Sequence, residues 1–312
     1  MSKKTILRLV GSITLLALLV WRLDLSQIAT AFLKVEWLWW VLAMLAYMIA
    51  QIVSSVRWQI LARPLGLERP LQRFVSLYFV GTFFNQLLPT SVGGDVMRAW
   101  HLDSEKGRRW IAFSSVFADR LTGLVALISL ACIASCFVSL PGWILLWVIS
   151  SGLGLLVGTL LLQRFPKVRK TVNQYRKHRA SWIGAIVLSF AIQSLNVILV
   201  WLLSRGIGLN LSPGYCFILM PLVTLLTLLP ISINGMGVRE GGMILLLSPL
   251  GIASESAVLL SLLWFLVFAS TGLIGGVVFF LGSFSKQKEL IDDRSISRDS
   301  DHERARQSAD AA

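Results

Sequence analysis

Long apolar runs constrain this chain more than any other feature of its sequence. A helix needs roughly 20 apolar residues to cross the 30 Å or so of hydrocarbon in a bilayer. Four runs reach that length: residues 37–61, 114–137, 182–203 and 256–281. Because 55% of the 312 residues are apolar and 14% are charged, a water-soluble domain of this size is excluded. The sequence therefore predicts an all-α integral membrane protein built as a polytopic helical bundle.

A further apolar run, residues 6–23, follows Lys3, Lys4 and Arg8 at the N-terminus. This pattern resembles a secretory signal peptide, but no small-residue cleavage site follows it. We therefore expect a retained first helix.

Basic residues between the apolar runs predict the topology. The loop 164–179 contains seven Lys or Arg and no acid, so the positive-inside rule places it in the cytoplasm, where it would also contact anionic lipid. The basic stretches 57–73 and 98–109 are expected on the same side. A single crossing by the apolar run 74–88 would separate them. We therefore predict a re-entrant hairpin that breaks at 89–94, where Pro and Gly interrupt the helix.

The break in this hairpin is repeated later in the chain. LPTSVGGDVMR at 88–98 and LPISINGMGVR at 229–239 share Leu, Pro, Ser, Gly and Arg at identical spacing, and each follows an apolar run. Chance similarity between two Gly/Pro breaks is the alternative. By the charge rule the second hairpin enters from the outside.

The repeat predicts two inverted-topology halves, about 37–137 and 182–281, with about six full spans and two hairpins, or about eight hydrophobic segments. Residues 1–282 would form a single membrane domain with both termini in the cytoplasm. The polar segment 283–312 lacks apolar periodicity and is expected to be a disordered tail. Such paired, interrupted segments indicate a transport site near the membrane midplane.

The two breaks also predict an anion site. A helix that starts inside the membrane presents unpaired N–H groups and the positive end of its dipole. Arg98 and Arg239 end the two motifs, and their guanidinium groups can form two hydrogen bonds to a phosphate. The alternative is that each Ser caps its own helix and each Arg pairs with Asp95 or Glu240. The expected hinge residues and hydroxyl groups of the two copies are Pro89, Ser91, Gly93, Gly94, Pro230, Ser232, Gly235 and Gly237.

Two charges lie inside an otherwise apolar stretch. Asp119 and Arg120 would each cost about 2.5–3.5 kcal/mol if they faced lipid. We expect them to face protein or water, with Asp119 bonded to an Arg of a hairpin. Asn85 and Asn234 lie beside the breaks and can satisfy backbone groups freed there.

Other classes of chemistry lack a sequence signal. The three His and three Cys show no spacing suited to metal binding or nucleophilic catalysis, so we expect no metal and no cofactor. The net charge of +13 is distributed between apolar spans, which argues against nucleic acid. No phosphate-binding G-x-x-x-x-G-K-[ST] motif occurs, so ATP is not expected to drive the protein directly.

Four motifs together resemble the flippase-like membrane family related to the transmembrane region of lysylphosphatidylglycerol synthetases. They are VRWQILARPLG, FNQLLPTSVGGDVMRAW, SSVFADRLTGL and LPISINGMGVREGG, within residues 7–281. The family commonly has Gly where this chain has Thr90 and Leu where it has Met236. The resemblance implies movement of an amphiphilic lipid between leaflets. Because the synthetase relatives add a soluble catalytic domain, this chain is not expected to make its own lipid.

Three functions remain open. The first is a lipid translocase of the bacterial inner membrane that moves an anionic, aminoacylated or polyprenyl-linked lipid. It would use Arg98 and Arg239 on phosphate, with Asp95, Asp119 and Glu240 balancing charge or holding a cationic headgroup. The second is a non-catalytic membrane partner of a glycosyltransferase or lipid synthetase. The third is an intramembrane lipid-modifying transferase, which the absence of a compact carboxylate cluster disfavours.

Overall fold

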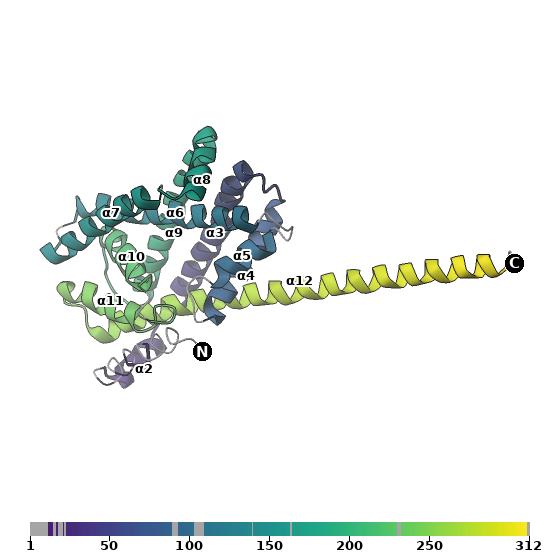
Figure 1. The fold of residues 1–312 in the computed structure, drawn as a ribbon. Coiled ribbons are helices and arrows are strands. Elements are labelled where there is room, and N and C mark those ends of the chain that lie inside the picture. The colour runs from purple at the N-terminus through teal and green to yellow at the C-terminus, as the bar shows by residue number, and fades with distance from the viewer. Residues whose placement is uncertain are drawn as a thin grey trace.

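Helices form all the regular structure in the described part of the chain (Figure 1). The structure is a computed structural model that describes residues 12–14, 17, 21, 23–88, 93–102, 109–138, 140–162, 164–229 and 232–310. Of residues 162, 166, 167, 170 and 283–310 it describes the backbone only. The prediction of an all-α protein is confirmed.

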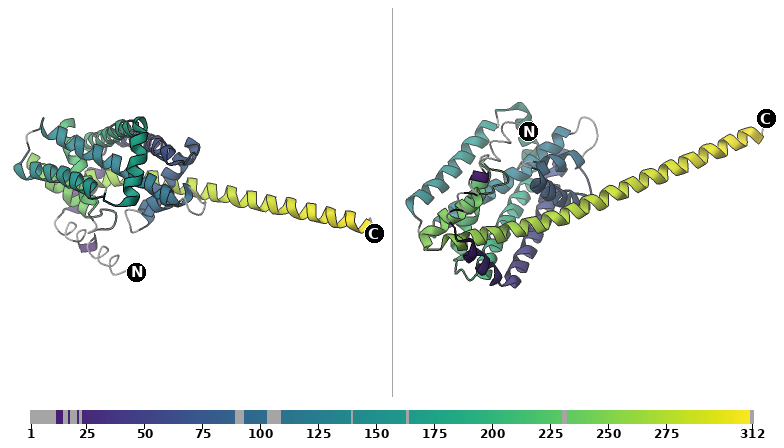
Figure 2. Two further views of the ribbon diagram at one scale, coloured as in Figure 1. Left: turned by 45° about the horizontal axis from the view of Figure 1, so that its top comes forward. Right: turned by 90° about the horizontal axis from the view of Figure 1, so that it is seen from below.

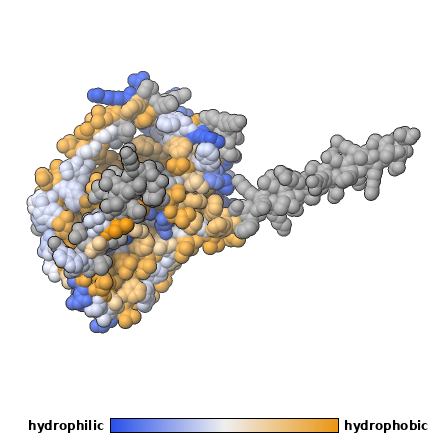
Figure 3. Space-filling model, turned by 60° about the horizontal axis from the view of Figure 1, so that its bottom comes forward, coloured by the Kyte–Doolittle hydropathy of each residue, from blue (hydrophilic) through white to orange (hydrophobic). Residues whose placement is uncertain are grey.

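Five of these helices are long and apolar enough to cross a membrane: Trp37–Leu65, Arg109–Ser135, Gly142–Leu161, Arg179–Gly206 and Ser254–Gly282. The exposed faces of these helices carry many apolar side chains, and apolar residues cover much of the surface seen in Figure 3. Hydrophilic side chains gather toward the edges of that view. The expected multi-pass membrane protein is thereby confirmed, while most of the predicted first span, residues 6–23, lies outside the described residues.

The same order of helix lengths occurs twice. A long helix, two short helices and a second long helix make up the first half, as α3 (Trp37–Ala62), α4 (Leu71–Leu87), α5 (Gly93–Leu102) and α6 (Arg109–Ser135). The second half is α9 (Arg179–Gly206), α10 (Pro213–Thr227), α11 (Val238–Leu247) and α12 (Ser254–Asp310). The remaining elements are α2 (Leu25–Leu33), η1 (Arg63–Leu65), α7 (Gly142–Leu162), α8 (Pro166–Lys177) and η2 (Ser248–Leu250).

Helix packing follows the same correspondence between halves. The first helices of the two halves, α3 and α9, pack along each other. The short helix α4 packs along α12, and its counterpart α10 packs against α6 (Figure 2). Exchanging the two halves therefore maps the α4–α12 pair onto the α10–α6 pair and the α3–α9 pair onto itself. The inverted membrane topology and the re-entrant character of the short helices stay predictions.

The α4–α12 contact depends on a glycine. A Cβ atom added to Gly275 would lie 1.9 Å from the carbonyl oxygen of Phe79. No side chain fits at that distance, so α12 can approach the backbone of α4 closely only where it has no Cβ. A similar constraint holds between α4 and α5, where a Cβ on Gly94 would lie 1.9 Å from the Gly81 carbonyl oxygen.

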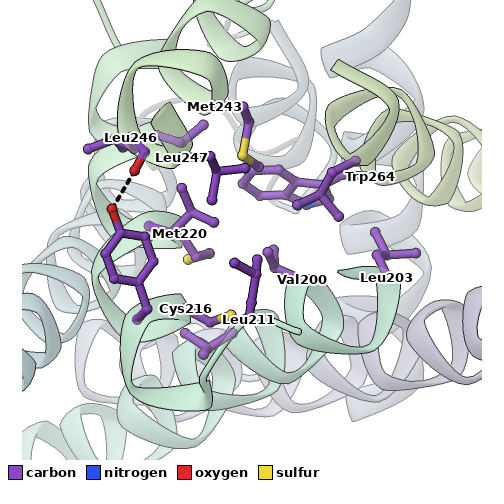
Figure 4. Packing of buried hydrophobic residues seen from close by; sticks show 14 of the residues in the cluster. Val200, Leu203, Leu211, Cys216, Met220, Met243, Leu246, Leu247 and Trp264 are labelled. Carbon is purple, nitrogen blue, oxygen red and sulfur yellow. Dashed lines mark hydrogen bonds between the residues drawn. The ribbon is translucent and has the colours of Figure 1, made fainter. Parts of the chain in front are cut away.

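The interior of the second half is an apolar core shared by all four of its helices (Figure 4). Leu203 comes from α9, Met220 from α10, Met243 from α11 and Trp264 from α12. The Tyr215 hydroxyl crosses the edge of this core to donate a hydrogen bond to the Leu246 carbonyl. Dispersion contacts of this kind hold helices together where lipid weakens the hydrophobic effect.

The basic segment 164–179 differs from the loop that we expected, because most of it forms helix α8. The Tyr175 hydroxyl donates to the Leu61 carbonyl at 2.8 Å, and Gln174 Nε2 donates to the Pro64 carbonyl at 3.1 Å. These bonds fix α8 against the end of α3. At the other end of the chain, α12 continues to Asp310 and projects out of the bundle (Figure 1). The boundary at residue 283 and the disorder of the tail stay predictions.

Replacing Gly275 with Ala is expected to destabilise the bundle. The added methyl group would overlap the α4 backbone, and overpacking of this kind costs about 1–3 kcal/mol or more. Gly241→Ala is the matched control, because its Cβ would meet nothing within 4 Å. Thermal unfolding of the purified variants in detergent measures both. Equal midpoints for the two variants would contradict the close contact between α4 and α12.

Candidate functional site

A cavity of about 880 Å³ lies inside the bundle and is lined from both halves and from α7. Its walls are largely apolar and include Leu121, Leu124, Leu155, Leu225, Trp264 and Phe268. Polar side chains interrupt this apolar lining on α3, α4, α9 and α10: Gln51, Ser54, Thr82, Gln193, Asn196 and Thr224. A cavity with both kinds of wall suits an amphiphilic molecule.

The two arginines of the repeated motif both line this cavity. Arg98 comes from α5 and Arg239 from α11, although they lie far apart in the sequence. Other predicted site residues that line it are Asn85, Asp119, Arg120 and Asn234. The carboxylates of Asp95 and Glu240 lie behind the lining, as ion-pair partners of arginines.

Asp119 is the centre of a buried ion network. Its Oδ1 accepts a hydrogen bond from Arg57 Nε at 2.8 Å, and its Oδ2 lies 3.6 Å from Arg98 Nη1. The Tyr78 hydroxyl lies 3.4 Å from Oδ2. Because the Asp119 side chain is 0% exposed, its charge depends entirely on these partners. Asp119 therefore has an ion-pair contact with Arg98 of the first repeated motif, and its hydrogen bond to Arg57 is shorter.

Asp95 pairs with Arg98 as well and adds one further arginine, Arg120, to the network. It accepts from Arg98 Nη2 at 2.7 Å, and its two oxygens accept from Nη2 and Nε of Arg120, both at 2.8 Å. The last arrangement is a bidentate pair, which restricts orientation as well as distance. Helices α3, α5 and α6 are thereby connected through charges.

Arg98 lies deep in this network. Its guanidinium carbon is 4.3 Å from the ring centroid of Tyr78 and 4.9 Å from that of Trp58, which are favourable cation–π distances. A Cβ on Gly81 would lie 2.7 Å from Cγ and Cδ of Arg98. The missing side chain at Gly81 therefore gives the arginine room to pass along α4.

A second, smaller network surrounds Arg239. The guanidinium is paired with the Glu240 carboxylate at 2.9 Å, and its Nε also donates to Ser261 Oγ at 2.9 Å. Ser261 Oγ in turn donates to Glu240 Oε1 at 2.8 Å, and the Gly237 N–H donates to Glu240 Oε2 at 2.6 Å. The Glu240 carboxylate thus has two roles: it caps the start of α11 and it neutralises the charge of Arg239. Both motif arginines pair with the carboxylates that the alternative reading named.

The two breaks are held by amide side chains. Asn85 Oδ1 accepts from the Gly94 N–H at 2.9 Å, and Asn234 Nδ2 lies 3.3 Å from the Gln86 carbonyl of the other half. Asn234 has a positive φ of 51°, which Asn tolerates better than most residues. The supporting role that we expected for both asparagines is consistent with these bonds.

The other predicted residues of the breaks that the structure describes, Gly93, Gly94, Ser232, Gly235 and Gly237, are not among the lining residues of the cavity. Gly235 and Gly237 adopt positive φ values of 75° and 82°, which favour glycine. Gly93 and Gly94 begin α5, and Ser232 Oγ is buried without a hydrogen-bond partner in the described part of the chain. Pro89, Ser91 and Pro230 lie outside the described residues.

Arg57 is the main site residue that the sequence analysis missed. We counted it among the basic residues of a cytoplasmic loop, whereas its side chain is 5% exposed and bonded to Asp119 and Ser189. Its position inside an apolar span was the available signal, because an intramembrane charge requires a partner. Gln51 and Ser54 lie on the same face of α3 at helical spacing and carried the same kind of signal.

Comparison with known proteins gives a consistent result. The family described as the Lysylphosphatidylglycerol synthase TM region matches residues 5–276. A UPF0104 membrane protein of Methanocaldococcus jannaschii is 24% identical over 302 residues, covering 84% of this chain and 89% of that protein. One of Methanothermobacter thermautotrophicus is 23% identical, covering 80% and 87%. No solved structure matches the chain.

Breaking the central ion pair is expected to destabilise the protein strongly. Asp119→Asn leaves Arg57 with a buried, uncompensated charge, and removal of one partner of such a pair costs about 3–5 kcal/mol. Arg57→Gln leaves Asp119 with only the longer ion-pair contact to Arg98 Nη1, at 3.6 Å, while the double variant removes both charges. A double-mutant cycle measured by thermal unfolding should therefore give a double variant more stable than the sum of the single changes predicts. Additive losses would show that the two charges do not interact.

Proposed function

The chain belongs to the Lysylphosphatidylglycerol synthase TM region family, and from this premise we propose that it moves an amphiphilic lipid between membrane leaflets. The observation that carries the proposal is that both repeated arginines line one cavity with mixed polar and apolar walls. A polar headgroup would be accommodated by the polar side chains, while the acyl or isoprenoid chains remain against apolar helices or in lipid. Candidate lipids are anionic phospholipids, aminoacylated phospholipids and polyprenyl-linked lipids.

The duplicated architecture supports this function. Helices α5 and α11 have ten residues each, which is about half the length needed to cross a bilayer. If α4–α5 and α10–α11 are re-entrant hairpins that enter from opposite faces, their breaks meet near the midplane, as in transporters with inverted repeats. Uncharged polar side chains in the lining, such as Gln51 and Asn196, could then hydrogen-bond to a headgroup as it moves through the cavity. These bonds would offset part of the desolvation cost of the headgroup.

Helix α8 fits the same setting. Its polar residues are mainly Lys and Arg, its hydrogen bonds fix it at the end of α3, and a basic surface of this kind attracts anionic headgroups. We place it at the cytoplasmic face of the cytoplasmic membrane, with both termini on that side. Transport would be facilitated or ion-coupled rather than driven directly by ATP.

Helix α7 offers a test that leaves the ion networks untouched. Gly154 lines the cavity, and a Cβ there would meet nothing within 4 Å, so Gly154→Trp introduces a large side chain at the cavity wall from an unobstructed position. Gly184 on α9 is equally unobstructed and does not line the cavity, so Gly184→Trp is the matched control. Leaflet exchange of fluorescent phospholipids in liposomes, followed by quenching of the outer leaflet, measures both.

We expect the wild-type protein and Gly184→Trp to accelerate exchange and Gly154→Trp to lose most of that acceleration. Equal exchange by the two variants would mean that lipid does not pass through this cavity. If the wild-type protein exchanges no lipid across a broad panel, the proposal fails. Co-purification with a lipid synthetase or glycosyltransferase would then support the role of a membrane partner.

A further inference from the structure

The charges around the cavity select among the candidate headgroups. We propose that the cavity binds a headgroup with a single net negative charge, as in a phosphodiester lipid without an ammonium group, and that Arg120 is the residue that contacts it. This inference rests on the proposed function and narrows it to one substrate class. It also assigns the phosphate contact to one half of the molecule instead of to both motif arginines.

The first step is the charge balance. Four arginines line the cavity: Arg57, Arg98, Arg120 and Arg239. Three carboxylates neutralise them, because Asp119 lines the cavity and Asp95 and Glu240 pair with the lining arginines. The described residues of the site therefore carry one positive charge in excess. In a low-dielectric interior an excess charge is costly unless a counter-charge binds.

The second step locates the excess in the first half. Arg239 and Glu240 form a one-to-one pair that Ser261 completes. Three arginines share Asp95 and Asp119 in the other network, so Arg98 lies between two carboxylates that already have other partners. Its Nε and Nη1 are buried and make no hydrogen bond within the described part of the chain. Arg98 is thus the under-neutralised cation.

The third step identifies the group that a ligand can reach. The side chains of Arg57, Arg98 and Arg239 are 5%, 2% and 8% exposed, whereas that of Arg120 is 53% exposed. Asp95 engages Nε and Nη2 of Arg120, and Nη1 keeps its donors free of any partner among the described residues. An anion in the cavity would accept from Nη1 of Arg120, while Arg98 behind it supplies the excess positive charge as a positioning residue.

The same balance disfavours the other headgroups. An aminoacylated headgroup has an ammonium group that needs a carboxylate, and all three carboxylates of the site are engaged by arginines. A pyrophosphate carries more negative charge than the one excess positive charge of the site can neutralise. The cost of desolvating its remaining negative charge would therefore not be compensated. A phosphodiester whose headgroup carries no ammonium group has a single net negative charge and matches the excess one to one.

The test is equilibrium binding of dioctanoyl lipids that differ only in headgroup to the full-length protein in detergent, measured by native mass spectrometry. The probes are phosphatidylglycerol, phosphatidylcholine, lysylphosphatidylglycerol and phosphatidylinositol 4-phosphate. We expect phosphatidylglycerol to bind about tenfold or more tightly than the other three, as one desolvated, charge-assisted contact allows. Arg120→Gln should remove that preference. Arg205→Gln, which changes a half-buried arginine outside the cavity that is bonded to Asn210, should retain it.

Two variants test the charge balance itself. Arg98→Gln leaves the pairs Arg57–Asp119 and Arg120–Asp95, a neutral cluster that should fold and bind the anionic and zwitterionic lipids equally. Asp95→Asn raises the excess to two charges and should shift the preference toward phosphatidylinositol 4-phosphate. A purely structural role for these residues would not reverse a headgroup preference.

Unchanged binding of phosphatidylglycerol by Arg120→Gln, or equal binding of all four lipids by the wild-type protein, would overturn the inference. Leaflet exchange in the same preparations separates it from the proposed function. Leaflet exchange without a headgroup preference would contradict only the proposed selectivity. Selective binding without leaflet exchange would support the selectivity and contradict the proposed translocase function.

Discussion

Charge pairing inside the bilayer is the constraint on which the rest of this structure depends. Asp119 is completely buried in a helix long enough to span the membrane, and hydrocarbon cannot solvate it. It is stable there because Arg57 of α3 and Arg98 of α5 bring guanidinium groups to it. Those two contacts require the three helices to meet at one depth, so a local electrostatic need determines how distant segments pack.

Glycines make that meeting sterically possible. Gly94 lets α5 lie against α4, Gly81 leaves space for the Arg98 side chain, and Gly275 lets α12 approach α4. Close backbone contact at a few points is compatible with a wide cavity elsewhere in the same bundle. The charged groups that line the cavity pair with one another inside the bundle instead of facing its apolar exterior.

The two halves share their helix order and their packing but differ in charge. One arginine and one carboxylate balance in the second half, whereas three arginines share two carboxylates in the first. A duplicated framework thus carries one neutral and one cationic end of a site. The shared helix order alone would not produce this difference in charge, and our proposal of a preference for anionic headgroups rests on it.

The sequence by itself determined the membrane setting and the helical class, because the length of an apolar run is a local property. It also predicted two corresponding interrupted segments from the placement of Pro and Gly, and their re-entrant character stays a prediction. It also identified Arg98, Asp119 and Arg239 as residues needing partners. Only the tertiary structure decided which partners they have, that Arg57 belongs to the site rather than to a loop, and that Arg120 alone among the lining arginines is accessible. These facts depend on how helices distant in sequence pack, and no local pattern specifies that.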